Sequence, residues 1–177
     1  MTAHGFTVFP TALGHCALAW GECGIVGSQL PEASEQRTRE RMRERFPHTP
    51  EAEPPPPVRN AVEGIVALLA GARPELSTIA LDLAGVPAFH RRVYYLVRTI
   101  PPGETMTYRA VAQRLGVPGA ARAVGQAMAR NPFAPIVPCH RVVAANGKGG
   151  GFSAFGGVST KRMMLAIERG STGAALL

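Results

Sequence analysis

Hydrophobic and polar positions predict different elements in the two parts of the chain. In the first part, apolar runs at 17–20 and 24–27 flank a short turn and indicate a β-hairpin. Residues 34–46 alternate Arg and Glu and predict an exposed helix with a solvated face. Helical spacing of apolar residues predicts a second helix at 58–69, and the apolar run at 77–83 predicts a further strand.

From Pro87 onward the pattern becomes helical. Apolar spacing predicts helices at 87–100, 108–115, 120–130 and 160–169. The second and third of these are short and are joined by a tight turn that contains glycine, which is typical of a helix-turn-helix. We therefore expect an α/β domain at 1–86, a small sheet with helices, followed by a mainly α domain at 87–177.

Charge separates the same two parts. The chain has 177 residues, 46% of them hydrophobic, and a formal net charge of +7. Residues 1–89 carry 7 Lys and Arg against 10 Asp and Glu, whereas residues 90–177 carry 12 against 2. A basic domain attracts polyanions, and nucleic acid is the partner that this charge favours, with a merely solvated basic surface as the alternative.

The composition gives little support for a membrane protein or for a secreted protein with disulfides. There is no apolar run long enough to cross a membrane and no secretion signal at the N-terminus. The cysteines are Cys16, Cys23 and Cys139, an odd and sparse set that fits a reducing cytoplasm better than a disulfide framework. We expect a cytoplasmic protein without membrane association.

The helix at 120–130 is unusual for a DNA reader, because it consists mostly of Ala and Gly with Arg122 near its start. A major-groove reader normally offers several long polar side chains to base edges. A thin helix suits the narrower minor groove and a protein that inspects any sequence. The alternative is that the small residues only permit close helix packing.

Cys139 stands in a setting that suggests a nucleophile. Three prolines precede it, which predicts that the thiol is held on a non-helical segment. His140 is adjacent and Arg141 adds positive charge, and both favour the reactive thiolate. A water bridging the thiol and the imidazole is expected, because neighbouring side chains rarely touch. Glu168, on the last predicted helix, is a candidate to orient the histidine.

Two other sites are disfavoured by their spacing. No second Cys or His follows Cys139 and His140 at zinc spacing, and His15, Cys16 and Cys23 do not form a convincing ligand set, so we predict no metal. The glycine-rich run at 147–151 lacks the ending of a P-loop and is expected to form a pocket wall.

Taken together, these motifs resemble the O6-alkylguanine-DNA alkyltransferases, the methylated-DNA–protein-cysteine methyltransferases. The resemblance covers about residues 81–170, in the family's order; the first eighty residues match it only in layout. The sequence departs from the family pattern in the loop between Val143 and Gly156, which is slightly longer, and at Phe152, where tyrosine is common. Tyr94–Tyr95 also replace a tryptophan, which we expect to be a core substitution. The matching motifs are Ile100–Tyr108 (IPPGETMTY), Ala121–Ala127 (ARAVGQA), Asn131–Pro132, Pro138–Val143 (PCHRVV), Gly156–Gly157, Lys161 and Glu168.

The resemblance implies a single-turnover reaction in which an alkyl group moves from O6-alkylguanine, or also from O4-alkylthymine, to Cys139. His140 and Glu168 would activate the thiol through water, Tyr108 would push the flipped nucleotide and polarise the base, and Asn131 would brace the turn before the cysteine. The pocket would be formed by Val142, Phe152, Ser153 and Lys161. Arg122 would fill the space left by the flipped base, and the other DNA contacts would come from Ala121, Ala123, Gly125, Gln126, Arg130 and Tyr108.

The same resemblance implies a ribonuclease-H-like first domain, a winged helix-turn-helix second domain and no cofactor. The partner would be double-stranded DNA containing alkylated guanine, bound by a monomer. Three alternatives stay open: a lesion-binding relative that does not react, a sequence-specific transcription factor and a cysteine hydrolase. The presence of Cys139 argues against the first, the Ala/Gly-rich helix against the second, and the lack of a recognisable oxyanion hole against the third.

Overall fold

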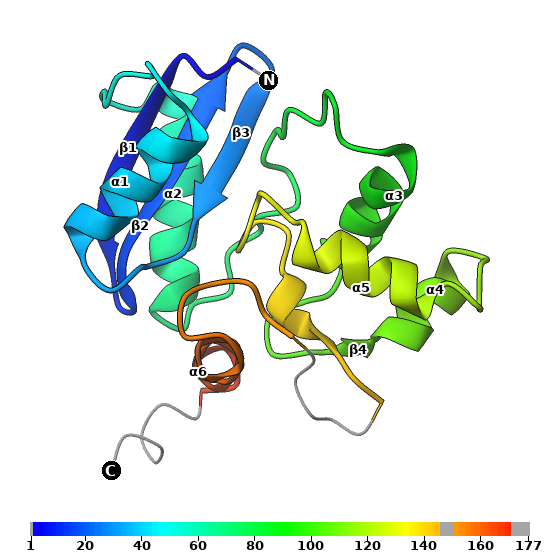
Figure 1. Cartoon of the computed structure of the whole chain (residues 1–177). Helices are drawn as coiled ribbons and strands as arrows, with labels where there is room; N and C mark the ends of the chain where they lie inside the picture. Colours follow the sequence, from blue (N-terminus) through cyan, green and yellow to red (C-terminus); the bar gives the residue numbers. More distant parts are fainter. Residues whose placement is uncertain (1, 146–150, 171–177) are drawn as a thin grey trace. The chain divides into compact units, whose positions relative to one another are not determined.

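The computed structural model describes residues 2–145 and 151–170 of the chain (Figure 1). These residues form two compact units. The first consists of Met1–Gly85 together with Pro132–Ile136, and the second of Val86–Asn131 together with Val137–Leu177. Each is described separately below. Within the described residues, no helix is both long and apolar enough to cross a membrane.

The first unit contains a three-stranded antiparallel sheet. Strands β1 (Gly5–Thr11), β2 (Gly14–Gly21) and β3 (Gly24–Gln29) follow one another in space as in sequence. Gly14 and Gly24 have positive φ angles of 122° and 129°, and each begins a strand directly after a tight turn. The hairpin predicted from the apolar runs is confirmed, since β2 pairs with β3.

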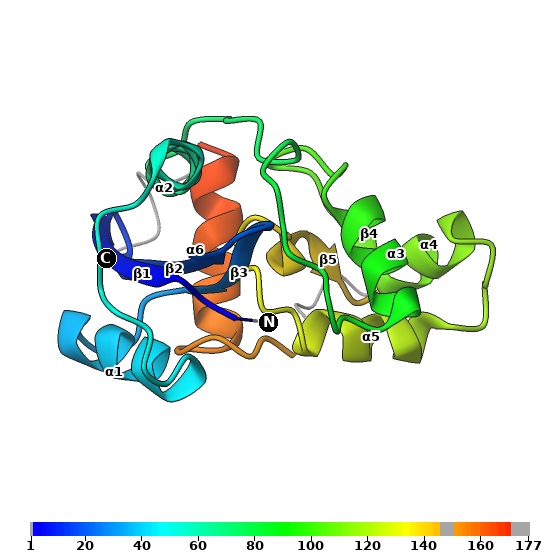
Figure 2. The ribbon, with the colours of Figure 1, turned by 90° about the horizontal axis from the view of Figure 1, so that it is seen from above.

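Two helices cover opposite faces of this sheet, as Figure 2 shows. Helix α1 (Glu35–Arg45) is the predicted charged helix, and the Ser34 side chain caps it by accepting a hydrogen bond from the Arg37 N–H. Helix α2 spans Pro56–Leu69. It begins two residues before the predicted start, because proline is tolerated in the first turn, where its missing N–H is not needed.

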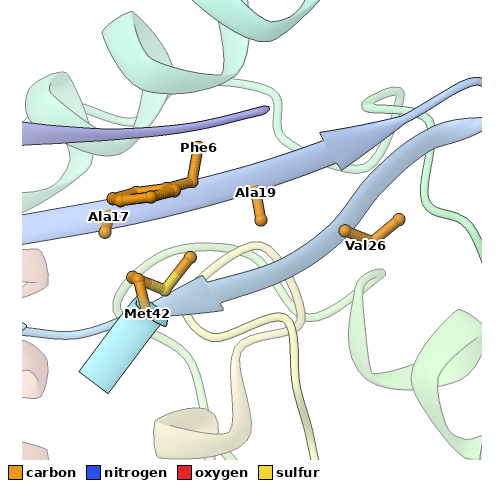
Figure 3. Close-up of a cluster of buried hydrophobic side chains, with 5 residues drawn as sticks. All are labelled: Phe6, Ala17, Ala19, Val26 and Met42. Carbon is orange, nitrogen blue, oxygen red and sulfur yellow. The ribbon is translucent and has the colours of Figure 1, made fainter. Parts of the chain in front are cut away.

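A small apolar cluster fills the space between α1 and the sheet (Figure 3). Although α1 is strongly charged, Met42 points inward from it and is fully buried. Ala17 and Ala19 lie two apart on β2 and therefore share a face, and their small size admits the larger side chains around them. The cluster consists of Phe6, Ala17, Ala19, Val26 and Met42.

The strand predicted at residues 77–83 is wrong. Only an isolated bridge forms there, between Leu81 and Ile25 of β3. The Ile25 N–H donates to the Ala80 carbonyl at 3.0 Å, and the Asp82 N–H donates to the Ile25 carbonyl at 2.8 Å. The Asp82 carboxylate then accepts the Ala84 N–H at 2.8 Å, which turns the chain and prevents further pairing.

The second unit is mainly helical, and its helices confirm the four predicted ones with ends that differ by up to three residues. Helix α3 packs against α4 and α5, which together form the predicted helix-turn-helix (Figure 1). Thr107 caps α4 by accepting the Ala110 N–H at 3.0 Å, and Gly116 follows α4 with a φ of 75°. The elements are α3 (Ala88–Val97), β4 (Met106–Thr107), α4 (Tyr108–Arg114), α5 (Ala121–Ala129), β5 (Val142–Val143) and α6 (Val158–Glu168).

Strands β4 and β5 form a short parallel pair that joins the helix-turn-helix to the cysteine segment. Met106 pairs with Val142, and Thr107 pairs with Val143. Thr107 also begins α4 as its cap, so the pairing fixes the start of α4 against the residues that directly follow Cys139. Tyr94 of α3 is buried, and its hydroxyl donates to the Ala127 carbonyl of α5 at 3.1 Å. Tyr95 is 60% exposed, so the expected core substitution holds for Tyr94 and is wrong for Tyr95.

Candidate active site

Cys139 begins a single 3-10 turn, η1 (Cys139–Arg141), that leads directly into β5. The prediction of a non-helical segment is therefore wrong at the cysteine itself. The turn requires one bond from the Arg141 N–H to the Pro138 carbonyl, which forms at 2.9 Å. Pro138 lacks an N–H but keeps its carbonyl, so it can open such a turn although it would disrupt a longer helix.

The Cys139 thiol is nearly enclosed, with the residue only 6% exposed. Burial raises the pKa of this thiol, and a hydrogen bond from Asn131 and the charge of Lys161 offset the effect only in part. Neighbouring groups thus do favour the thiolate, but burial outweighs them in the resting protein. The thiol holds its proton at neutral pH and needs a base to become a nucleophile.

That base lies next in the chain and is coupled to a carboxylate. Nε2 of His140 lies 2.7 Å from Oε1 of Glu168, and both side chains are buried. Burial lowers the pKa of His140, although Glu168 acts in the opposite direction. Burial alone would raise the pKa of Glu168, but hydrogen bonds from His140 and Arg141 lower it to about 2. At neutral pH the pair is a neutral imidazole and an ionised carboxylate.

The tautomer of His140 follows from this pairing. An ionised carboxylate only accepts hydrogen bonds, so Nε2 carries the proton and donates it to Glu168. Nδ1 is then the basic nitrogen. It is buried and has no hydrogen-bond partner among the residues that the structure describes. This nitrogen is therefore available to receive a proton from the thiol region.

Arg141 is part of this arrangement, which sequence reasoning missed by treating it as a general positive charge. Its Nε lies 3.1 Å from Oε2 of Glu168, and its Nη2 lies 2.8 Å from Oε1. Its Nη1 donates to the Ile100 carbonyl at 2.6 Å, and the Gly103 N–H donates to Glu168 Oε2 at 2.8 Å. Glu168 thus joins α6, the cysteine turn and the loop before β4. Residues 90–177 contain only two acids, and this scarcity was the signal that Arg141 and Glu168 could be partners.

Lys161 is buried on α6 and supports the residue after the cysteine turn. Its Nζ donates to the Val142 carbonyl at 2.6 Å. It also lies 5.8 Å from the centre of the Tyr108 ring and 6.0 Å from that of Phe152. Burial lowers the pKa of Lys161, whereas Cys139 acts to raise it. The structure therefore brings Val142, Tyr108 and Phe152 around one ammonium group.

Tyr108 is the first residue of α4, and Asn131 follows the end of α5. Nδ2 of Asn131 donates to the Val137 carbonyl at 2.8 Å and so closes the loop that leads to Cys139. Tyr108 is partly buried, and burial raises the pKa of its phenol, which therefore stays protonated at neutral pH. A Cβ at Gly125 would lie 4.0 Å from Cδ1 of Tyr108, an ordinary van der Waals contact, so the ring lies beside this position of α5 without requiring a glycine there.

The outward face of α5 carries the candidate DNA contacts. Val124, Ala127 and Met128 are buried, so the opposite side of the helix is free. Arg122 and Gln126 are exposed on that side, and so is Arg130 at the helix end. The small residues predicted to contact DNA are partly buried: Ala121, Ala123 and Gly125.

The other predicted pocket residues differ in exposure, and part of the predicted pocket wall is not described. Ser153 is exposed in the segment before α6, whereas Phe152 is partly buried beside Lys161. Residues 147–150 of the predicted pocket wall lie outside the described residues. Within the described part of the chain, His, Cys, Asp and Glu form no group of three or more that could hold a metal ion.

Comparison with known proteins gives the same family from sequence and from structure. Residues 88–170 match the family described as "6-O-methylguanine DNA methyltransferase, DNA binding domain". The methylated-DNA–protein-cysteine methyltransferase of Mycolicibacterium paratuberculosis is 48% identical over 116 residues, which cover 66% of this chain and 68% of that protein. The protein of the same name from Methanothermobacter thermautotrophicus is 32% identical over 151 residues, covering 85% and 77% respectively.

The similarity to solved structures of this family covers nearly the whole chain. The O6-methylguanine methyltransferase of Mycobacterium tuberculosis aligns with a TM-score of 0.76 at 35% identity and covers 97% of this chain and 96% of its own. A structure of the Mycobacterium tuberculosis protein in complex with DNA aligns equally well and covers 94% of both chains. The Pyrococcus kodakaraensis enzyme shares the fold with a TM-score of 0.73.

Proposed function

Because this chain belongs to the methylated-DNA–protein-cysteine methyltransferases, we propose that it repairs DNA directly by moving an alkyl group from O6-alkylguanine to Cys139. The observation that carries this proposal is the buried thiol of Cys139 beside a neutral His140 whose partner, Glu168, is ionised. A thiol that keeps its proton at rest, with a base next to it, is suited to react only when a substrate is in place.

DNA is the partner that the charge and the relatives support. Arg122 and Gln126 of α5 and Arg130 at its end form an exposed polar edge, and the other residues of the helix that are not buried have small side chains. Such a surface can press into the minor groove without reading base edges. A base inside the duplex cannot reach an enclosed thiol, so the damaged guanine must leave the stack, and Arg122 would occupy the space it leaves.

Proton transfer comes first. The raised pKa of Cys139 keeps the thiol protonated until a base takes the proton. One water would carry it to Nδ1 of His140, and the Nε2–H bond to Glu168 would stabilise the imidazolium that results. Asn131, which hydrogen-bonds the Cys139 side chain, and the charge of Lys161 both lower the pKa of the thiol and so favour the thiolate once it forms.

Displacement follows in one step. The thiolate attacks the alkyl carbon in line with its bond to O6, a C–S bond forms, the C–O bond breaks, and the electron pair stays with guanine. The protonated phenol of Tyr108 would stabilise the developing negative charge. The Val142 carbonyl, which has a second lone pair beside its bond from Lys161, would accept the exocyclic amine. Ser153 would contact the oxygen, and Phe152 would line the pocket.

The product is a thioether, whose C–S bond is stable in water, so in this proposal each molecule acts once. In this proposal the lesion is an alkylated guanine in duplex DNA, with alkylthymine as a further candidate, and the protein acts as a monomer without a cofactor. We also assign the first unit to a ribonuclease-H-like class and the second to the winged helix-turn-helix class. The antiparallel sheet with a helix on each face and the α3–α4–α5 arrangement support that assignment.

The alternative is a protein that binds alkylguanine without reacting, and stoichiometry separates the two. We expect a duplex with one O6-methylguanine to regain guanine in an amount equal to the protein added and no greater. The Cys139→Ala variant should still bind the lesion duplex while restoring none. If the wild-type protein binds the lesion and restores no guanine, the non-reacting alternative is correct.

A further inference from the structure

The five residues Pro132–Ile136 belong to the first unit, although the chain on both sides of them belongs to the second. Asn131, which directly precedes this segment, bonds the Val137 carbonyl and the Cys139 side chain. Ile136, at the other end, lies three residues before the reactive cysteine. The segment therefore connects Asn131, which bonds the Cys139 side chain, to Val137, which leads into the cysteine turn, and whatever holds the segment also helps to place these two residues.

Ser28 holds the segment from the edge strand β3. Its N–H donates to the Pro132 carbonyl at 2.8 Å, and its hydroxyl donates to the Ala134 carbonyl at 2.5 Å. Ser28 is buried, so these bonds are shielded from competing water. Ser28 of β3 thus holds two carbonyls of the segment, those of Pro132 and Ala134.

Arg45, in the last turn of α1, holds Ser28 and the segment together. Its Nη1 donates to the Ser28 carbonyl at 2.6 Å and to Oε1 of Gln29 at 3.1 Å, and its Nη2 donates to the Pro132 carbonyl at 3.4 Å. Among the described residues no carboxylate forms an ion pair with this guanidinium, and burial lowers its pKa. Within the described part of the chain, and apart from the Phe46 ring, whose centre lies 5.4 Å from Cζ of Arg45, this guanidinium is bound by neutral oxygens alone. A partly buried cation without a carboxylate is costly to keep, which indicates a specific use.

Gly27 makes the approach of Arg45 possible. A Cβ at this position would lie 2.9 Å from Nη2 of Arg45 and 2.6 Å from Cζ of Phe46, which is too close for either group to stay in place. The sequence of β3 therefore leaves an opening beside Ser28 for the guanidinium. Ser28 and Arg45 thus both donate to the Pro132 carbonyl, and Gly27 leaves the space in which Arg45 can do so.

We infer that Arg45 and Ser28 are positioning residues for alkyl transfer, which act on Cys139 through the segment Pro132–Ile136. The inference rests on the proposed function and assigns a role in it to the first unit. Loss of this hold would let Asn131 shift and weaken the bond by which it lowers the pKa of the thiol. Small displacements of a reacting group cost large factors in rate even when the change is distant.

Kinetics on the full chain test the inference. At saturating lesion duplex, Arg45→Ala should slow methyl transfer about tenfold, and Ser28→Ala about threefold, with the dissociation constant for the duplex unchanged within about twofold. The pH dependence of transfer should move to higher pH in both. Arg45→Lys, which keeps the charge and one donor, should recover part of the rate.

Two variants separate positioning from general stability. Met42→Ala destabilises the core of the same unit from the same helix without touching the segment, and Arg41→Ala removes an exposed charge nearby. Both should transfer the methyl group at the wild-type rate at temperatures where they are folded. Equal slowing in Met42→Ala and Arg45→Ala at matched stability would overturn the inference, as would wild-type rates in both Arg45→Ala and Ser28→Ala.

Hydrogen exchange of the free protein distinguishes failure of the inference from failure of the proposed function. The Cys139 N–H donates to the Val137 carbonyl at 2.8 Å and reports on the loop directly. We expect this amide to exchange about tenfold faster in Arg45→Ala and Ser28→Ala and at the wild-type rate in Met42→Ala. If the wild-type protein transfers no methyl group, the proposed function fails, while faster exchange alone still supports the hold on the loop. Unchanged exchange together with wild-type transfer rates would refute the inference.

Discussion

Nε2 of His140 and Oε1 of Glu168 lie 2.7 Å apart, although 28 positions separate the residues in the sequence. The carboxylate fixes which nitrogen of the imidazole is basic and also binds Arg141 and the Gly103 N–H. The basicity of His140 and the packing of the surrounding loops therefore both depend on the two carboxylate oxygens of Glu168. A single substitution of Glu168 should affect both.

Glu168→Gln should slow methyl transfer and destabilise the protein. The amide cannot stabilise an imidazolium, so His140 becomes a weaker base, and the pKa of Cys139 in the working site should rise. Arg141 would also keep its buried charge without a carboxylate, for which a cost of about 3–5 kcal/mol in unfolding free energy is typical. Denaturant unfolding and a thiol titration of the variant measure the two effects. An unchanged thiol pKa would count against the proton relay.

The stability of the protein should fall in acid. Glu168 has a pKa of about 2 in the folded state against 4.5 as its ordinary value, so its contribution is complete above pH 4.5 and is lost as the pH falls toward 2. The pKa of buried His140 is also lowered, so its contribution begins to fall below pH 6.5. The Glu168 shift alone corresponds to about 3 kcal/mol. Urea unfolding from pH 7 to 3 should show the larger part of this loss, and a flatter profile for Glu168→Gln would attribute it to this group.

Arg122→Ala should impair repair of duplex DNA much more than reaction with free alkylguanine base. Flipping is needed only in the duplex and costs a few kcal/mol, so a loss of about 10- to 100-fold on duplex is expected, with little change on the free base. Arg59→Ala, which removes an exposed charge of the first unit, is the matched control. Equal losses on both substrates would discredit the role of Arg122.

The pattern of residues revealed much of the second unit and less of the first. Helical spacing and turn residues were enough to predict the helix-turn-helix, because local sequence determines helix ends and caps. The pairing of His140 with Glu168 could be proposed because few acids were available. The raised pKa of Cys139 could not, because burial is a property of the folded chain. The strand predicted at 77–83 failed for a similar reason, since Asp82 turns the chain after one bridge.

Lys161→Met should raise the pKa of Cys139 further and slow transfer. The ammonium group is among the influences that lower this pKa, and methionine preserves the volume but not the charge. The Val142 carbonyl would also lose its donor, at a cost of about 1–3 kcal/mol in stability. Titration of thiolate absorbance, with exposed Arg162→Met as the control on the same helix, measures the shift. Equal pKa values for Cys139 in both variants would exclude this electrostatic role.

Transfer of the alkyl group to one particular sulfur is the central claim, and the mass of the intact protein measures it most directly. After incubation with a duplex that carries O6-methylguanine, the wild-type protein should gain the mass of one methyl group, located on Cys139 by peptide analysis. Cys139→Ala should gain nothing, even though the exposed thiol of Cys23 remains. No mass gain in the wild-type protein, or a methyl group found on Cys23, would contradict the account.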